Sequence, residues 1–328
     1  MSNTSTTAAV AQEEVVDPSR PIIDPHHHIW DNRVAPYSLD DYHQDVTDGH
    51  NIVGSIFVEC GGGTAAPGIE AGVDEAGKAS AAADALDASR PPMLGIIAHV
   101  DLNRGDAVAQ SLDAMREATG SRLVGIRHST AWSDDPAVPL HRASVGPGVS
   151  GRESWRRGFR RLADHGLAFD AWVYHPQLIE LADLACAFPD TFIVVDHLGG
   201  PVRLSSDGPR SRREVLSETQ AGLSQLVDLD NVVLKIGGIG MRLLGNDEPT
   251  PASSEDLVNA WGPFISWCID SFGADRCMFE SNFPVDRETC TARSLWNAFK
   301  TISGSGSEDE KTALFSGTAR RVYQVDAG

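Results

Sequence analysis

The chain lacks the features that mark several large classes of protein. Its five cysteines are odd in number and include no CxxC pair, so neither a disulfide framework nor a thiolate zinc site is expected. No stretch approaches the roughly 20 apolar residues of a membrane helix. The formal net charge of -19 leaves no basic surplus for binding nucleic acid or an anionic membrane. These absences favour a cytoplasmic protein that acts on a small molecule.

The first 20 residues also lack the apolar run of a signal peptide, and they carry acids where a transit peptide has arginines. We therefore predict a disordered tail over residues 1–20 and a single domain over residues 21–328.

Apolar runs alternate with helix-like segments along the rest of the chain. The runs predict eight strands, at 21–23, 51–60, 93–99, 123–128, 167–174, 191–197, 231–236 and 276–283. Helices are expected at 69–89, 105–118, 152–165, 176–188, 212–227, 254–272, 287–302 and 307–324, whereas 31–50 has no period and indicates a loop. The strand runs are continuously apolar, as in parallel strands buried on both faces.

Eight strand–helix units in about 300 residues predict an α/β protein with a distorted (β/α)₈ barrel. Long loops at 129–151, 198–211 and 237–253 would cover its C-terminal face. A doubly wound sheet is the competing architecture. Against it, the glycines at 61–63 do not fit the GxGxxG spacing of a dinucleotide site, and no P-loop is present.

Three consecutive histidines follow the first predicted strand, in the segment DPHHHIWD (24–31). Side chains alternate between the two faces of a strand. His26 and His28 should therefore point the same way, while His27 points away from them. Two imidazoles on one face can converge on one ion or one substrate atom.

Polar or ionisable residues end almost every predicted strand, and in a barrel these ends meet at the C-terminal face. They are Glu59, His99, Arg127, His128, His175, Asp196, His197, Lys235, Glu280 and Asn282. Structural roles compete for three of them: His99 can cap a strand, His175 can begin a helix, and Lys235 can pair with an acid between strands.

Four segments carry a resemblance to the amidohydrolase superfamily: DPHHHIWD (24–31), GIRH (125–128), VVDHLGGP (194–201) and MFESNFPVD (278–286). In particular, the chain from Ile22 to about Tyr323 resembles the amidohydrolase-related branch that includes 2-pyrone-4,6-dicarboxylate lactonase, sulfomuconolactone hydrolase and the sugar-acid lactonases. The resemblance implies that the imidazoles of His26, His28 and His197 face one another and position 282. It also implies one divalent metal ion held by these three histidines. Zinc or manganese suits such ligands, and a metal-free site stays an alternative.

Position 282 departs from this pattern, because many relatives have an aspartate where this chain has Asn282. An amide can bind a metal through its oxygen, but it cannot accept a proton near neutral pH. Glu280, Glu59 and Asp286 are the carboxylates that could serve as the base instead. Histidines acting alone are the other possibility.

The resemblance therefore predicts hydrolysis of a cyclic ester or amide in a small anionic substrate, with lactones of aromatic catabolism as the leading class. His197, Asn282, Glu59 and Glu280 are the predicted catalytic residues, and Arg127, His128, Trp132 and His175 are the predicted substrate-binding residues. Arg127 resembles the family's arginines that grip carboxylates, with an inter-strand ion pair as its alternative role.

Two other functions remain open from the sequence: a non-oxidative decarboxylase on the same barrel, and a binding protein without turnover. The aromatic residues Trp261, Phe264 and Trp267, at helical spacing, could belong to the core or to a subunit contact in a homo-oligomer.

Overall fold

Eight parallel strands form one sheet whose spatial order follows the chain, in a computed structural model that describes residues 13–31, 33, 35–61, 70–138, 146–203, 210–245 and 250–327. The strands are β1 (Pro21–His27), β2 (Asn51–Val58), β3 (Met93–Ala98), β4 (Leu123–Arg127), β5 (Ala168–Ala171), β6 (Ile193–Val195), β7 (Val232–Ile236) and β8 (Cys277–Phe279). All eight predicted strands are present, and most of them are shorter than predicted.

The residues after β8 return to β1 and bring the sheet close to a closed barrel. The backbone N–H of Asn282 donates to the carbonyl of His26 at 2.9 Å, and the N–H of His28 donates to the carbonyl of Phe283 at 2.8 Å. The predicted (β/α)₈ barrel is therefore confirmed.

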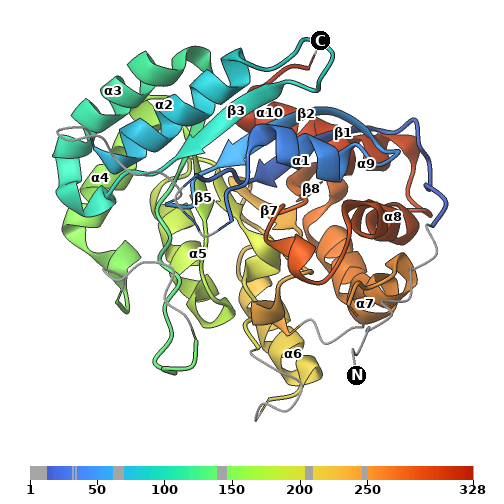
Figure 1. The fold of residues 1–328 in the computed structure, drawn as a ribbon. Coiled ribbons are helices and arrows are strands. Elements are labelled where there is room, and N and C mark those ends of the chain that lie inside the picture. The colour runs from blue at the N-terminus through green and yellow to red at the C-terminus, as the bar shows by residue number, and fades with distance from the viewer. Residues whose placement is uncertain are drawn as a thin grey trace, which may run out of the picture.

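Helices surround these strands (Figure 1). They are α1 (Leu39–Val46), α2 (Ala71–Asp84), α3 (Val108–Thr119), α4 (Glu153–Asp164), α5 (Leu178–Ala187), α6 (Arg212–Leu223), α7 (Ser254–Phe272), α8 (Ala292–Ile302), α9 (Glu308–Thr312) and α10 (Thr318–Tyr323). A π-helical turn at Ala313–Gly317 joins α9 and α10, so the helix predicted at 307–324 has two parts. Side chains of α10 pack into the barrel interior, where Tyr323 is buried.

The prediction of a loop at 31–50 was wrong in part, because this segment contains α1. A capping box begins that helix: the hydroxyl of Ser38 accepts from the N–H of Asp41 at 3.2 Å, and the carboxylate of Asp41 accepts from the N–H of Ser38 at 2.8 Å. Leu39, Tyr42 and Val46 are buried at helical spacing. The helix has only eight residues, several of them acidic, so its apolar positions are too few to show a helical period in the sequence.

We expect Ser38→Ala to lower the free energy of unfolding by about 1 kcal/mol, because it leaves the backbone N–H of Asp41 without its side-chain acceptor. Ser38→Thr is the control, since threonine keeps the hydroxyl that caps α1 and donates to Asp41. Urea denaturation followed by circular dichroism measures both variants. Equal stability of Ser38→Ala and the wild type would mean that the cap does not stabilise the helix.

The predicted tail is described from residue 13 onward, and there it contacts α8. The N–H of Val16 donates to the side-chain oxygen of Asn297 at 2.8 Å, and Arg293 donates to the carbonyl of Glu13 at 2.9 Å. Residues 1–12 lie outside the described residues, as do parts of the three predicted face loops, at 139–145, 204–209 and 246–249. On α7, Trp261 and Phe264 are buried and Trp267 packs against them, so this stripe contributes to the core.

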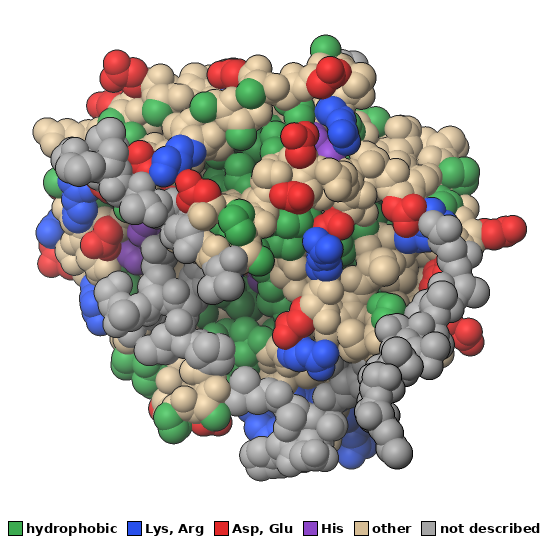
Figure 2. All heavy atoms as spheres, in the orientation of Figure 1, with side chains coloured by type: hydrophobic (Ala, Val, Ile, Leu, Met, Phe, Trp, Pro, Cys, Tyr) green, Lys and Arg blue, Asp and Glu red, His purple; other side chains and the backbone are tan. Residues whose placement is uncertain are grey.

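Across the described part of the chain, the helices are too short or too polar to traverse a bilayer. On the described surface visible in Figure 2, Lys and Arg side chains stand among Asp and Glu side chains, and no extended patch of one charge forms there.

Candidate active site

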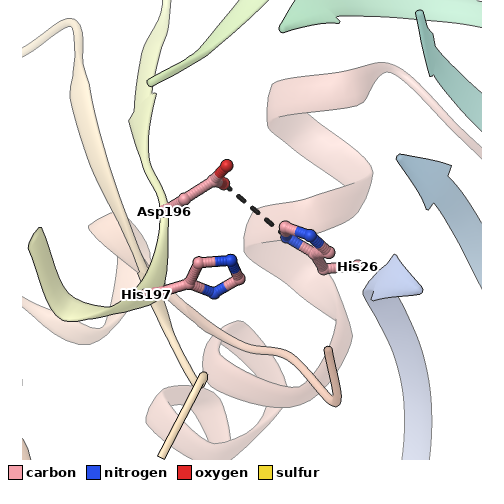
Figure 3. A group of neighbouring side chains, drawn as sticks. All are labelled: His26, Asp196 and His197. Carbon is pink, nitrogen blue, oxygen red and sulfur yellow. Dashed lines mark ion pairs between the residues drawn. The ribbon is translucent and has the colours of Figure 1, made fainter. Parts of the chain in front are cut away.

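Three buried imidazoles meet at the C-terminal ends of β1 and β6. The Nε2 atoms of His26 and His28 are 3.3 Å apart, and the rings of His26 and His197 are 4.6 Å apart between their centres. Figure 3 shows Asp196 and His197 facing His26, with the dashed line marking the ion pair between Asp196 and His26. His27 lies on the opposite face, stacked on Tyr42 at 4.0 Å. The side chains therefore lie as the alternation of a strand predicts.

One carboxylate orients two of these imidazoles. Glu280 places Oε1 at 2.6 Å from Nδ1 of His197 and Oε2 at 2.7 Å from Nδ1 of His26. Burial alone would raise the pKa of Glu280, but the attraction of the two imidazoles outweighs it and lowers this pKa below its ordinary value. Burial likewise opposes the charge on His197, yet Glu280 raises the pKa of that imidazole. Glu280 is therefore an anion held between two rings.

These contacts fix which ring nitrogens carry lone pairs. His28 Nδ1 lies 2.7 Å from the carbonyl oxygen of Val58, which can only accept, so Nδ1 carries the proton and Nε2 the lone pair. Burial lowers the pKa of both His26 and His28, which keeps both rings neutral near pH 7.

His26 has a cation as well as an anion near Nδ1, because Nζ of Lys235 lies 3.4 Å away. The Glu280 oxygen is closer, at 2.7 Å, and we therefore place the proton on Nδ1 and the lone pair on Nε2. Nη1 of Arg127, which can only donate, lies 3.3 Å from that Nε2, in agreement with a lone pair there.

Buried ion pairs surround the imidazoles. Arg127 donates from Nε to Oε1 of Glu59 at 3.0 Å and from Nη1 to Oδ2 of Asp196 at 3.3 Å. Lys235 contacts Asp170 at 2.5 Å and Asp196 at 3.5 Å. Arg127 thus forms the ion pair that was its alternative role, and Lys235 pairs with acids between strands. Both Arg127 and Glu59 are occupied by these contacts.

Asn282 lies at the end of β8 with its side chain against Asp286. Its Nδ2 donates to Oδ1 of Asp286 at 2.8 Å, while Oδ2 of Asp286 accepts from the N–H of Gly240 at 2.9 Å. Both side chains are buried, and burial raises the pKa of Asp286 to about 7 despite these hydrogen bonds.

The remaining predicted residues contact other partners. Nδ1 of His128 accepts from the N–H of Leu102 at 3.1 Å. His175 lies 3.3 Å from Glu218, and burial lowers its pKa to about 4. The backbone N–H of Trp132 donates to Gln177 at 2.9 Å, and its side chain is half-buried.

Other residues of the cluster were not assigned a role from the sequence. Trp172, just after β5, packs its ring edge-on to His197 with centres 4.8 Å apart. Asp196 directly precedes His197, and its position at a strand end was the signal that could have placed it. Gly237 leaves room for Glu280, because a Cβ there would lie 2.7 Å from the Glu280 carbonyl oxygen and closer still to its side chain.

The donor set fits a divalent metal ion. A cation, Nη1 of Arg127, already lies 3.3 Å from Nε2 of His26, and the Nε2 atoms of His26 and His28 are 3.3 Å apart. That spacing is about the edge of a tetrahedron whose nitrogen ligands are roughly 2.0–2.1 Å from zinc. Ligand atoms of His26, Asp196 and His197 also lie within 4.8 Å of one another. Oδ2 of Asp196 is engaged by Arg127, whereas Oδ1 has no hydrogen bond within the described residues and lies 3.7 Å from Nδ1 of His26, so Asp196 is a candidate ligand beside His28.

Comparison with known proteins places this site in a family. The sequence model of the family described as Amidohydrolase matches residues 23–325. The chain is 31% identical over 326 residues to the uncharacterized protein y4mH of Sinorhizobium fredii, covering 93% of this chain and 98% of the relative. It is 25% identical over 317 residues to an L-fucono-1,5-lactonase of Burkholderia multivorans, covering 92% and 96% of the two chains.

Among solved structures, an amidohydrolase of Burkholderia multivorans crystallised with bound zinc has a TM-score of 0.73. It is 21% identical, and the alignment covers 93% of this chain and 99% of that one. The match of the family model over nearly the whole barrel, including all four segments of the resemblance, shows that this chain belongs to the Amidohydrolase family of hydrolases.

Proposed function

We propose that this protein hydrolyses the ring ester of a small lactone at the cluster formed by His26, His28 and His197. The observation that carries the proposal is the convergence of two imidazole lone pairs at 3.3 Å, beside a third imidazole held by the same carboxylate. Such a cluster binds an electrophilic centre at the place where the strand ends of a barrel hold substrate.

Nε2 of His26, His28 and His197 would hold one divalent ion, because their Nδ1 atoms face Glu280 or Val58. Such an ion supplies a Lewis acid and lowers the pKa of a water molecule towards neutrality. Zinc is the ion we favour, and the zinc in the Burkholderia multivorans amidohydrolase supports that choice.

The chain's own residues support water attack without a free carboxylate base. Glu59 is paired with Arg127, and both oxygens of Glu280 face imidazoles. We infer that Glu280 orients the rings and raises their basicity, as outer-shell carboxylates do at metal sites. The acceptor oxygen of Asn282 would hydrogen-bond the attacking water.

The proposed substrate is a lactone, and the L-fucono-1,5-lactonase relative favours a sugar-acid lactone within that class. The expectation of a carboxylated, aromatic-derived substrate came from the family resemblance, in which Arg127 was the residue expected to grip the carboxylate. Because this arginine already pairs with Glu59 and Asp196, a neutral ring now has the better support. An anionic substrate and a cytoplasmic location stay predictions.

Turnover in ¹⁸O-labelled water tests the reaction. Purified protein is incubated with two panels, neutral sugar-acid 1,5-lactones and carboxylated pyrones, and the products are analysed by mass spectrometry. Hydrolysis places one heavy oxygen in the new carboxylate of the product. Release of CO₂ without ring opening would instead identify a decarboxylase, and binding without turnover of either panel would identify a binding protein.

A further inference from the structure

The hydrogen bond to Asp286 sets the orientation of the side-chain amide of Asn282, whose oxygen and NH₂ group could otherwise exchange places. Asn282 has a φ of 54°, a left-handed conformation that asparagine adopts more readily than most residues. Its backbone N–H is bonded to His26, and its backbone carbonyl accepts from Val285 at 2.8 Å and from Asp286 at 3.2 Å. The backbone therefore holds Asn282 in place and leaves only the side-chain amide to be oriented.

In its ionised form, Asp286 can act only as an acceptor toward Asn282. Its Oδ2 accepts from the N–H of Gly240, and a Cβ at Gly240 would lie 2.7 Å from Cβ of Asp286, so the two segments are in close contact. Its Oδ1 faces Nδ2 of Asn282 at 2.8 Å. Within the described part of the chain, the amide oxygen of Asn282 makes no hydrogen bond and is the polar atom left for a ligand.

We propose that Asp286 is a positioning residue for Asn282, holding its amide with the carbonyl oxygen turned away from Asp286 to receive a hydrogen bond from the attacking water. This inference rests on the proposed hydrolysis. Asp286 does not contact the water in this arrangement, and its role is only to accept the hydrogen bond from Asn282.

Single exchanges at this pair break its hydrogen-bond pattern. In Asn282→Asp, two carboxylates face each other at the present 2.8 Å, so one must take up a proton or move. In Asp286→Asn, the new amide faces two donors, the N–H of Gly240 and Nδ2 of Asn282, and has only one oxygen to offer them. With the Asn282 amide in its present orientation, a buried donor is left unpaired; if that amide instead flips to accept from the new NH₂ group, its oxygen no longer faces away from position 286.

The exchange of both residues restores the pattern with its direction reversed. In Asn282→Asp/Asp286→Asn, the oxygen of the new amide accepts from Gly240 and its NH₂ group donates to the carboxylate at 282. The second carboxylate oxygen at 282 then occupies the place of the original acceptor. The hydrogen bond to Gly240 and the one between the two side chains are both restored, so this double variant can be measured even where a single variant fails to fold.

The test measures kcat and KM for the best lactone, together with zinc content and melting temperature, in the wild type, both single variants and the double variant. We expect kcat to fall at least about tenfold in each single variant, with KM within a few-fold and zinc content unchanged. The double variant should recover at least tenfold over the weaker single variant. Losses that simply multiply in the double variant, or a fully active Asp286→Asn, would overturn the positioning role.

A readout without turnover separates this proposal from the proposed function. In protein labelled with ¹⁵N-asparagine, the side-chain NH₂ signal that disappears in Asn282→Asp belongs to Asn282. We expect its protons to exchange slowly in the wild type and much faster in Asp286→Asn. If no lactone is hydrolysed and this exchange difference is present, the proposed function fails while the contact stands. If lactones are hydrolysed and the exchange is equal, the positioning role fails alone.

Discussion

Replacing His26 and His28 together with alanine should lower kcat/KM for lactone hydrolysis by at least about 10³-fold, because it removes two lone pairs that face the reacting centre. Their Nε2 atoms are 3.3 Å apart, while Nδ1 of His28 is hydrogen-bonded to the carbonyl of Val58 and Nδ1 of His26 lies 2.7 Å from Glu280. The same variant should no longer retain zinc after dialysis. Both results are measured on protein whose circular dichroism spectrum matches the wild type.

His27 supplies a matched control on the same strand. Its ring stacks on Tyr42, away from the cluster, and within the described residues neither of its ring nitrogens has a hydrogen-bond partner. His27→Phe keeps an aromatic ring in that place and should keep both activity and zinc. A comparable loss in His27→Phe and in the double alanine variant would show that the effect comes from the strand and not from the Nε2 pair.

Glu280→Gln should weaken zinc binding roughly 10–100-fold and lower kcat/KM by a similar factor or more. A glutamine offers one oxygen and one NH₂ group to two imidazole N–H groups that now share a carboxylate. The ring that faces the NH₂ group must move its proton to Nε2, which removes that lone pair. Zinc affinity is measured by competition with a chelator; an unchanged affinity would exclude the orienting role of Glu280.

Gly237→Ala should displace the carboxylate of Glu280 without altering its charge. The added Cβ would collide with the Glu280 side chain and lie 2.7 Å from its carbonyl oxygen, so Glu280 must shift. Gly151→Ala is the control, because nothing lies within 4 Å of a Cβ at that position. We expect only the first variant to lose zinc affinity.

Much of the fold could be predicted because each buried strand is a continuous apolar run followed by a helical segment. The shared face of His26 and His28 followed from the period of a strand, and their approach to His197 followed from the meeting of strand ends in a barrel. Helix α1 was missed because its stability comes from the cap at Ser38 and from burial of Tyr42, neither of which gives a long periodic pattern.

The partners of the charged residues could not be predicted, because they depend on side chains that cross the barrel. Arg127 on β4 pairs with Glu59 after β2 and with Asp196 after β6. Because both carboxylates are far from Arg127 in the sequence, residue spacing could not show that they neutralise its charge. Glu280 was a candidate base, and only the three-dimensional structure places its two oxygens against two different imidazoles. The contact between the side-chain amide of Asn282 and Asp286, four residues later, was likewise not predictable from the sequence, because it depends on the left-handed backbone conformation of Asn282.

The most direct test of the three-imidazole site is the zinc-edge X-ray absorption spectrum of wild-type protein loaded with one equivalent of zinc. Our account predicts scattering from about three imidazole rings with nitrogen at roughly 2.0–2.1 Å. It also predicts that this scattering disappears in the His26→Ala/His28→Ala variant. Zinc bound without imidazole scattering, or a spectrum that is the same in that variant, would contradict it.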